Sequence, residues 1–494
     1  MRRTYLVIIL LSAVVPSCCE SGEVWKYKVI YQLLTDRFSQ GLSDPATPCS
    51  DLGNWCGGTY QGVIAKIGYL ADLGVDAVWI SPIVMNTELT TNKNQSGYHG
   101  YWAQDIYQIQ TRFGSIEDLE QLVQECHDHN ISVMVDVVPN HMGYQAGCDW
   151  EWENCPNLED FSMFYPFDKP EYYHTPCQIT DNLNQEEMER CRLANLPDLN
   201  QDNPEVRKIL YDWIASLTAR FGFDGYRIDT ARHVDKNFWP EFQDSAGTFV
   251  LGEVAGDETR LEYDASYQEV MDGVLNFPTY YCLKRVFAED FPMTYLKENL
   301  DKQREYFRNL KLTGTFIDNH DTMRFLNTVG KDFSKLRNAL AFVLFGEGIP
   351  IIYAGTEHEF LGGESFSENR ESVWPYFGQT SGTFSFLKTS LAIRKTILAT
   401  VVEAEMVDCF VDENFYIVKK QSDKETIVLG ITKAEIDGET LSVPISCFEG
   451  SDKAVFENVY SGQIFETENG ALEVLFNVAR DPVLLKSFQN VNEI

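Results

Sequence analysis

The chain has 494 residues, 44% of them hydrophobic, and carries a formal net charge of −34 at pH 7. This length exceeds the size at which one hydrophobic core keeps growing, so two or more domains are expected. The negative charge argues against nucleic acid or an anionic membrane surface as a partner, and it fits a soluble protein that binds a neutral or cationic molecule.

Residues 1–20 have the layout of a secretory signal peptide. Arg2 and Arg3 precede an apolar run over residues 5–11, and small residues follow. The run is too short for a lasting membrane span, although a membrane-anchored N-terminus is the alternative. No later stretch is long and apolar enough to cross a bilayer. We therefore expect a secreted, extracellular protein, free or associated with the cell wall, that has no membrane contact after signal removal.

The cysteines predict a disulfide-bonded protein, because an oxidising compartment allows them to pair. Their spacing favours four pairs, although sequence alone does not fix the connectivity. These pairs are Cys49–Cys56, Cys148–Cys155, Cys177–Cys191 and Cys409–Cys447. Cys126 and Cys282 are expected to be free and buried. Sequons at Asn94 and Asn130 are candidate glycosylation sites.

A strand–helix–strand rhythm runs through residues 21–139 and resumes over residues 200–400. Such a rhythm predicts parallel strands with crossover helices, and eight candidate strands predict a (β/α)8 TIM barrel. The candidates are residues 29–34, 75–80, 131–138, 222–229, 248–253, 271–277, 315–321 and 348–355. After the third strand, residues 140–199 lack periodicity and form an irregular inserted subdomain. Residues 401–494 contain short strands without helices and predict a C-terminal all-β sandwich.

Three of the candidate strands lead into an acid: Asp229, Glu253 and Asp321. Chemistry in such a barrel is built at the carboxyl ends of the strands, so the three acids predict one acidic site. Retaining glycosidases need two carboxyl groups about 5–5.5 Å apart. Arg227 shares a strand face with Asp229 and would keep it ionised, whereas apolar neighbours would raise the pKa of Glu253. The alternative for an isolated Arg-x-Asp is a structural salt bridge.

Four segments resemble, in order, the signature segments of the α-amylase family of glycoside hydrolases. They are residues 136–141 (DVVPNH), 225–233 (GYRIDTARH), 252–254 (GEV) and 316–321 (FIDNHD). Residues 98–102 (YHGYW), 196–199 (LPDL) and 271–276 (MDGVLN) are similar to secreted fungal-type α-amylases in particular. The resemblance covers nearly all of the mature chain.

The resemblance implies a role for each matched residue. Asp229 would be the nucleophile, Glu253 the acid/base, and Asp321 the carboxylate that holds sugar hydroxyls and stabilises the transition state. The further substrate contacts it implies are Tyr101, Trp102, His141, Arg227, Arg232, His233, His320 and Arg370. It also implies a structural Ca²⁺ between the barrel and the insert, bound by oxygens of Asn140, Glu189 and Asp198 and by the carbonyl of His233.

Three departures from the family pattern bear on the substrate cleft. Arg232 replaces the usual lysine on the leaving-group side, Phe366 stands where the family has an aspartate, and the usual cysteine before residue 271 is absent. We expect a monomeric enzyme that cleaves internal α-1,4 bonds of starch- or glycogen-like α-glucans with retention. The alternatives are a transglycosylase that remodels cell-wall α-glucan and a non-catalytic carbohydrate-binding protein on an amylase scaffold.

Overall fold

The computed structural model describes residues 22–41, 43–88, 95–365, 367–434, 440–448, 454–477 and 479–487. Eight parallel strands form its central sheet in the order β8-β7-β6-β5-β2-β1-β10-β9. A parallel bridge between Leu275 and Gly314 joins the two ends of this order and closes a barrel. The strands are β1 (Ile30–Leu33), β2 (Ala77–Ile80), β5 (Ser132–Val137), β6 (Gly225–Ile228), β7 (Phe249–Gly252), β8 (Gly273–Val274), β9 (Gly314–Thr315) and β10 (Ile349–Tyr353). The predicted TIM barrel is confirmed, although β8 and β9 are shorter than expected.

The helices that surround the barrel are amphipathic, and their caps fix where they begin and end. In α5 (Ile116–Asp128), Leu119, Leu122 and Cys126 are buried at helical spacing, and Ser115 forms a capping box at the N-terminus. The other helices are α1 (Gly22–Trp25), α2 (Thr35–Phe38), α3 (Tyr60–Ile64), α4 (Ile67–Leu73), α7 (Pro204–Phe221), α8 (Trp239–Ala246), α9 (Leu261–Ala265), α10 (Phe277–Ala288), α11 (Met293–Tyr306), α12 (Phe325–Thr328), α13 (Phe333–Phe345), α14 (Gly382–Thr396) and α15 (Leu398–Glu403). Short 3₁₀ turns are η4 (Ala231–His233), η5 (Lys236–Phe238), η6 (Ser266–Glu269), η7 (Leu310–Leu312) and η8 (Trp374–Tyr376).

Large apolar side chains fill the barrel interior. Trp25, Trp79, Phe249 and Leu251 belong to one buried cluster inside the sheet. A side chain at Gly225 would bring its Cβ within 2.8 Å of the Trp25 ring, so only glycine fits at this point of β6. The barrel is therefore packed solid below the level at which its strands end.

Side chains alternate along β6, and Arg227 shares a face with Asp229 as predicted. Tyr226 and Ile228 belong to the buried cluster between the barrel and its helices. Arg227 lies between them in sequence and points the other way, toward Asp136 on β5 and Asp229. A strand places successive side chains on opposite faces, so β6 carries Arg227 into the mouth of the barrel.

Two excursions leave the carboxyl ends of β2 and β5. The first contains the antiparallel pair β3 (Val84–Asn86) and β4 (Ala103–Ile109). The second is the predicted insert, whose regular elements are η1 (Trp152–Asn154), η2 (Pro170–Tyr172), α6 (Gln185–Arg190) and η3 (Leu193–Asn195). Disulfides Cys148–Cys155 and Cys177–Cys191 lie within it, as predicted.

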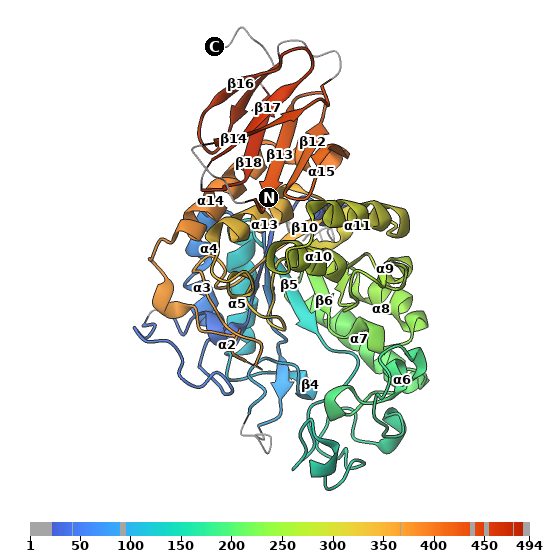
Figure 1. The fold of residues 1–494 in the computed structure, drawn as a ribbon. Coiled ribbons are helices and arrows are strands. Elements are labelled where there is room, and N and C mark those ends of the chain that lie inside the picture. The colour runs from blue at the N-terminus through green and yellow to red at the C-terminus, as the bar shows by residue number, and fades with distance from the viewer. Residues whose placement is uncertain are drawn as a thin grey trace, which may run out of the picture.

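The C-terminal part is an antiparallel β sandwich at the opposite end of the barrel from α6 and β4 (Figure 1). One sheet has the order β11-β12-β13-β18-β15-β16, the other pairs β14 with β17, and Ile417, Val474 and Leu485 share the core between them. The strands are β11 (Met406–Val411), β12 (Phe415–Gln421), β13 (Thr426–Thr432), β14 (Thr440–Ile445), β15 (Val455–Asn458), β16 (Ile464–Glu466), β17 (Leu472–Asn477) and β18 (Val483–Ser487). This arrangement leaves the carboxyl ends of the barrel strands open for a site.

The remaining sequence features are partly described. Disulfides Cys49–Cys56 and Cys409–Cys447 are present, and Cys126 and Cys282 are buried and unpaired, as predicted. The signal peptide, Asn94 and Phe366 lie outside the described residues, whereas Asn130 is exposed. None of the helices in the described part of the chain has both the length and the apolarity that a membrane span requires.

Candidate active site

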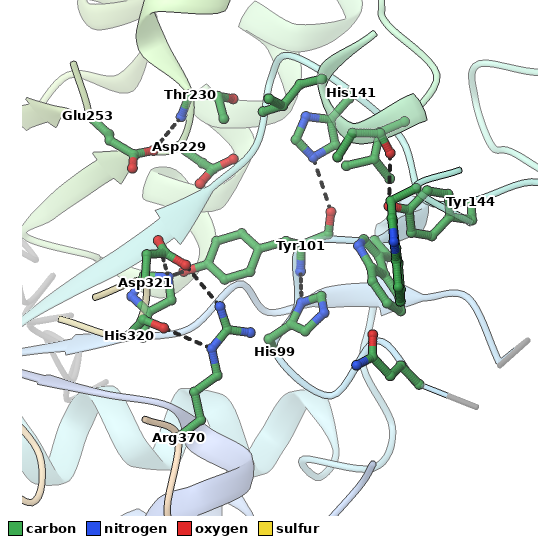
Figure 2. Close-up of a pocket in the computed structure, with 16 residues that line it drawn as sticks. His99, Tyr101, His141, Tyr144, Asp229, Thr230, Glu253, His320, Asp321 and Arg370 are labelled. Carbon is green, nitrogen blue, oxygen red and sulfur yellow. Dashed lines mark hydrogen bonds and ion pairs between the residues drawn. The ribbon is translucent and has the colours of Figure 1, made fainter. Parts of the chain in front are cut away.

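A pocket of about 590 Å³ lies where β6 and β7 end, and the insert forms part of its wall. Its lining includes eight of the residues that the sequence singled out: Tyr101, Trp102, His141, Asp229, Glu253, His320, Asp321 and Arg370. Loops far apart in the chain supply these residues, and Figure 2 shows Tyr101 in the middle of the group. The convergence of the three acids that the sequence predicts is therefore present.

One buried guanidinium joins the carboxyl groups beneath this pocket. Arg227 is 1% exposed, and its Nη1 lies 2.8 Å from Asp136 Oδ1 and 2.8 Å from Asp229 Oδ1. Its Nη2 lies 2.9 Å from Glu253 Oε2. A guanidinium is planar and permanently charged, so Arg227 holds all three carboxyl groups in fixed positions.

The backbone after β6 also positions Glu253. Thr230 has φ 51° and ψ 38°, a left-handed conformation that is rare for a β-branched residue. This turn aims the Thr230 N–H at Glu253, whose Oε2 accepts it at 2.9 Å (Figure 2). Glu253 directly follows β7, so a short rigid connection and two donors define its place. The local strain falls at a functional site, where such strain tends to be found.

Asp321 approaches the pocket on a loop and not on a strand, contrary to the sequence prediction. β9 ends at Thr315, and the Asn319 side chain then accepts the Asp321 N–H at 2.9 Å. This Asx turn draws the chain out of the extended conformation. Arg370 Nη2 lies 2.9 Å from Asp321 Oδ1, and His320 Nε2 lies 3.1 Å from Oδ2. The Asp321 side chain remains 43% exposed, which leaves it accessible to a ligand.

The environments of the three acids separate their pKa values. Burial raises the pKa of Glu253 to about 7; Arg227 opposes this rise, and Asp229 and Asp321 add to it. Burial likewise raises the pKa of Asp229 to about 6, although Arg227 lowers it. For Asp321 burial acts in the same direction, but His320, Arg370 and Arg227 outweigh it and hold the pKa below its usual value. Glu253 is thus the acid that keeps its proton to the highest pH.

Two of the three histidines that line the pocket, His141 and His320, are neutral near pH 7. Burial lowers the pKa of His141 to about 4 and that of His320 to about 3. His141 Nε2 contacts the carbonyl of Tyr101 at 3.3 Å, and His320 Nε2 lies 2.8 Å from the Tyr101 hydroxyl. Neutral imidazoles can both donate and accept, so these groups are suited to hydroxyl recognition.

Comparison with known proteins places this chemistry in a family. Residues 32–382 match the family model described as the α-amylase catalytic domain. The chain belongs to the α-amylase family. α-Amylase 2 of Schwanniomyces occidentalis is 36% identical over 377 residues, which cover 75% of this chain and 72% of that protein. The fold is similar to an α-amylase from Malbranchea cinnamomea, with TM-score 0.85, 33% identity, and 94% and 97% of the two chains covered. It is also similar to an α-amylase from Geobacillus thermoleovorans complexed with acarbose, with TM-score 0.81, 27% identity, and 94% and 99% covered.

Members of the α-amylase family are glycoside hydrolases that act with retention, and this chain is therefore an enzyme of that class. Three residues predicted to contact substrate lie outside the pocket lining, and Arg227, beneath the pocket, is one of them. Arg232 Nη1 donates to the carbonyl of Ala255 at 2.7 Å, and the His233 ring contacts the carbonyl of Met188 at 3.0 Å. Their contact with substrate stays a prediction.

The residues that an α-amylase calcium site would use come together in two pairs. The carbonyl of Asn140 accepts the N–H of Leu199, the residue after Asp198. His141 and Asp198 form an antiparallel bridge, so Asn140 and Asp198 lie on paired backbone segments. Asn140 Oδ1 and Asp198 Oδ1 are buried oxygens without a hydrogen-bond partner. His233 contacts Met188, which precedes Glu189. Among the described residues, no group of three or more His, Cys, Asp or Glu side chains could hold a metal. The two unpaired oxygens nevertheless suit a hard cation, with carbonyl and amide ligands completing the set.

The sequence did not identify several residues that build the site. Asp136 and His99 lie within matched segments, but only their neighbours were assigned roles. Asp136 accepts from Arg227, from the Tyr101 hydroxyl at 2.8 Å and from Trp79 Nε1 at 3.1 Å. An acid inside an apolar strand is a signal that could have marked Asp136. Tyr144 and Trp150 of the insert also line the pocket, and no pattern in the sequence marked them.

Proposed function

We propose that the protein hydrolyses internal α-1,4-glucosidic bonds of starch- or glycogen-like α-glucans with retention of configuration. The observation that carries this proposal is the joining of Asp229 and Glu253 by the one buried guanidinium of Arg227, beneath a pocket that Asp321 also lines. The named α-amylases among the similar proteins, one of them solved with acarbose, support an α-glucan as substrate.

The roles follow from the pKa order. An oxygen of ionised Asp229 attacks the anomeric carbon while protonated Glu253 gives its proton to the glycosidic oxygen, and the bond between carbon and oxygen breaks. Glu253, now ionised, then takes a proton from water, whose oxygen attacks the anomeric carbon and releases Asp229. Asp321 keeps its negative charge near the oxocarbenium-like transition state and accepts hydrogen bonds from sugar hydroxyls.

Product analysis with maltoheptaose tests the proposal. The expected early products are several shorter maltooligosaccharides, because cleavage is internal, and NMR should show that they form as α-anomers. Asp229→Asn should abolish cleavage with an unchanged melting temperature. Release of glucose alone from one end, or initial β-anomers, would refute the assignment. A lack of cleavage by the folded wild-type protein would favour the alternative of a non-catalytic carbohydrate-binding protein.

A second candidate is transfer of the glucosyl unit to another sugar in cell-wall α-glucan. The observation that favours it is the position of Arg232, which replaces the family lysine and donates to the Ala255 carbonyl. Arginine keeps the charge of the usual lysine but not its shape, so the leaving-group side would bind an acceptor differently. In the same maltoheptaose assay, products longer than the substrate would indicate transfer, whereas only shorter ones would indicate hydrolysis.

We also infer a structural Ca²⁺ between the barrel and the insert. Asn140 and Asp198 would bind it through their unpaired buried oxygens, with Glu189 and the His233 carbonyl as further ligands. The ion would supply positive charge that ties the insert to the barrel and would not take part in bond cleavage. Chelation should lower the melting temperature, and added Ca²⁺ should restore it. An unchanged melting temperature after exhaustive chelation would contradict the inference.

The organisation and location of the protein complete the proposal. We infer a signal peptide over residues 1–20, a barrel over 21–139 and 200–400, an insert over 140–199 and a sandwich over 401–494. Four disulfides support an oxidising, extracellular location. We further propose glycosylation at Asn94 or Asn130 and a monomer in solution. Mass spectrometry of the secreted protein and light scattering test these points.

A further inference from the structure

One wall of the active-site pocket is apolar and comes from the insert together with the excursion after β2. Trp102, Tyr144, Cys148 and Leu196 form a separate buried cluster, and Tyr101 packs against it. The Trp102 and Tyr144 rings meet edge to face, with centroids 4.9 Å apart. In Figure 2, Tyr144 lies on the far side of Tyr101 from Asp229 and Glu253. The wall therefore faces the part of the pocket that is remote from the reacting bond.

A short disulfide-closed loop stands on this wall. Cys148 and Cys155 are bonded, and the buried carboxylate of Asp149 between them binds the loop from inside. Asp149 Oδ1 accepts the N–H of Glu151 at 2.7 Å, and Asn154 Nδ2 donates to both its oxygens at 3.1 and 3.0 Å. The disulfide and these hydrogen bonds within the loop hold its shape without a ligand.

Hydrogen bonds connect this loop, and Tyr144 before it, to residues 194 and 195 later in the insert. Asn195 Nδ2 donates to the Asp149 carbonyl at 2.8 Å, and the Tyr144 hydroxyl donates to the Ala194 carbonyl at 2.9 Å. Ala194 and Asn195 both have positive φ, 46° and 64°. Non-glycine residues rarely adopt this conformation, so the contacts that hold these residues there fix the wall in one shape.

Trp150 is the residue that this scaffold presents to the pocket. It lines the pocket and is 36% exposed, whereas Trp102, Tyr144 and Leu196 are only 5–6% exposed. A large aromatic side chain on a braced loop loses little conformational freedom on binding, which makes it an effective anchor. The C–H-rich face of a glucose ring is the apolar surface that an α-glucan offers to such an indole.

We propose that Trp150, held by the Cys148–Cys155 loop, is an aromatic platform for a glucosyl unit of the bound α-glucan that is remote from the cleaved bond. It determines how strongly chain length affects turnover. The inference rests on the proposed function for the identity of its ligand. Trp150 takes no part in the chemistry itself, so its loss acts through binding of the extended substrate.

Trp150→Ala is compared with Trp152→Ala on maltotriose and maltoheptaose. Trp152 is the matched control, because it lies on the same loop and does not line the pocket. Trp150→Ala should lower kcat/KM for maltoheptaose about tenfold, the size of one aromatic contact, and for maltotriose less than about twofold. Trp150→Phe should recover most of the loss. Trp152→Ala should leave both substrates unaffected.

Three results would overturn the inference. They are an equal loss on both substrates, no loss on either, or the same loss in Trp152→Ala. An equal loss with a lowered melting temperature would mean that the side chain only supports the loop. Maltoheptaose binding is also measured by tryptophan fluorescence in the inactive Asp229→Asn variant, with and without Trp150→Ala. This measurement separates the contribution of Trp150 to binding from its effect on catalysis. If the wild type binds maltoheptaose through Trp150 but does not cleave it, the proposed function fails and the platform stands.

Discussion

Replacement of Asp136 by asparagine tests the charge balance around Arg227. Asp136 is 1% exposed and accepts hydrogen bonds from Arg227, Tyr101 and Trp79. It does not itself line the pocket. Asparagine has nearly the same shape and keeps one accepting oxygen, but it removes a negative charge. Asp136→Asn should therefore alter the titration of the catalytic acids more than it alters the fold.

The size of the effect follows from the geometry. The oxygens of Asp136 and Asp229 both lie 2.8 Å from Arg227 Nη1. They are therefore no more than about 6 Å apart, where two unit charges at an effective dielectric constant of about 20 repel by roughly 3 kcal/mol. Since one pKa unit corresponds to about 1.4 kcal/mol, removal of that repulsion should lower the pKa of Asp229 by about two units. The carboxylate of Asp136 is among the causes that raise this pKa to about 6.

The assay is the pH dependence of kcat/KM for a chromogenic maltooligosaccharide. Activity requires ionised Asp229 and protonated Glu253, so the wild type should show limbs near pH 6 and 7, as macroscopic values of the pair. In Asp136→Asn the acid limb should move to roughly pH 4, and the alkaline limb should move much less, because Asp136 binds Nη1 of Arg227 whereas Glu253 binds Nη2. The alkaline limb is thus an internal control. An unmoved acid limb, or equal shifts of both limbs, would refute this account of Arg227.

Three further predictions concern the acid, the insert and the domain junction. Glu253→Gln should lower kcat on unactivated oligosaccharides by at least about 10²-fold at an unchanged melting temperature, and near-normal activity would exclude Glu253 as the acid. Asp198→Asn should remove the dependence of the melting temperature on Ca²⁺, and an undiminished dependence would exclude Asp198 as a ligand. Burial lowers the pKa of Lys420 to about 7 from an ordinary 10.5, so the unfolded chain binds more protons and the free energy of unfolding should rise with pH between these values. Lys420→Met should abolish that rise of up to roughly 5 kcal/mol in urea titrations, whereas Lys419→Met, on the same strand, should retain it.

The barrel could be predicted because its strands have a simple pattern. Each of the eight is apolar, short and separated from the next by a helical segment or the insert, and local patterns of this kind survive in the fold. The short length of β8 and β9 could not be predicted in the same way. After β9 the Asn319 side chain satisfies the N–H of Asp321 in a turn, and the sequence does not show whether an asparagine near a strand end forms such a turn.

Site residues could be predicted where they lie in segments that match the family. Residues that only tertiary contacts bring to the pocket could not. Asp229, Glu253 and Asp321 follow barrel strands, so topology alone brings them to one end. Trp150 reaches the pocket only because the Cys148–Cys155 loop packs on residues 193–196, which come much later in the chain. A long-range contact of this kind leaves no periodic signal in the sequence.

Two carboxyl groups bound to the cation of Arg227 can have different roles because their other neighbours differ. Asp229 and Glu253 are both buried, and both accept from this guanidinium. Burial raises the two pKa values together, so the cation alone would not distinguish them. Arg227 opposes both rises, and neighbouring carboxylates add to both: Asp229 and Asp321 raise the pKa of Glu253, whereas Asp136 and Asp321 raise that of Asp229. The two acids thus differ in which carboxylates lie near them, which is why a change at Asp136, on the side of Asp229, should move one limb of the pH profile and leave the other nearly in place.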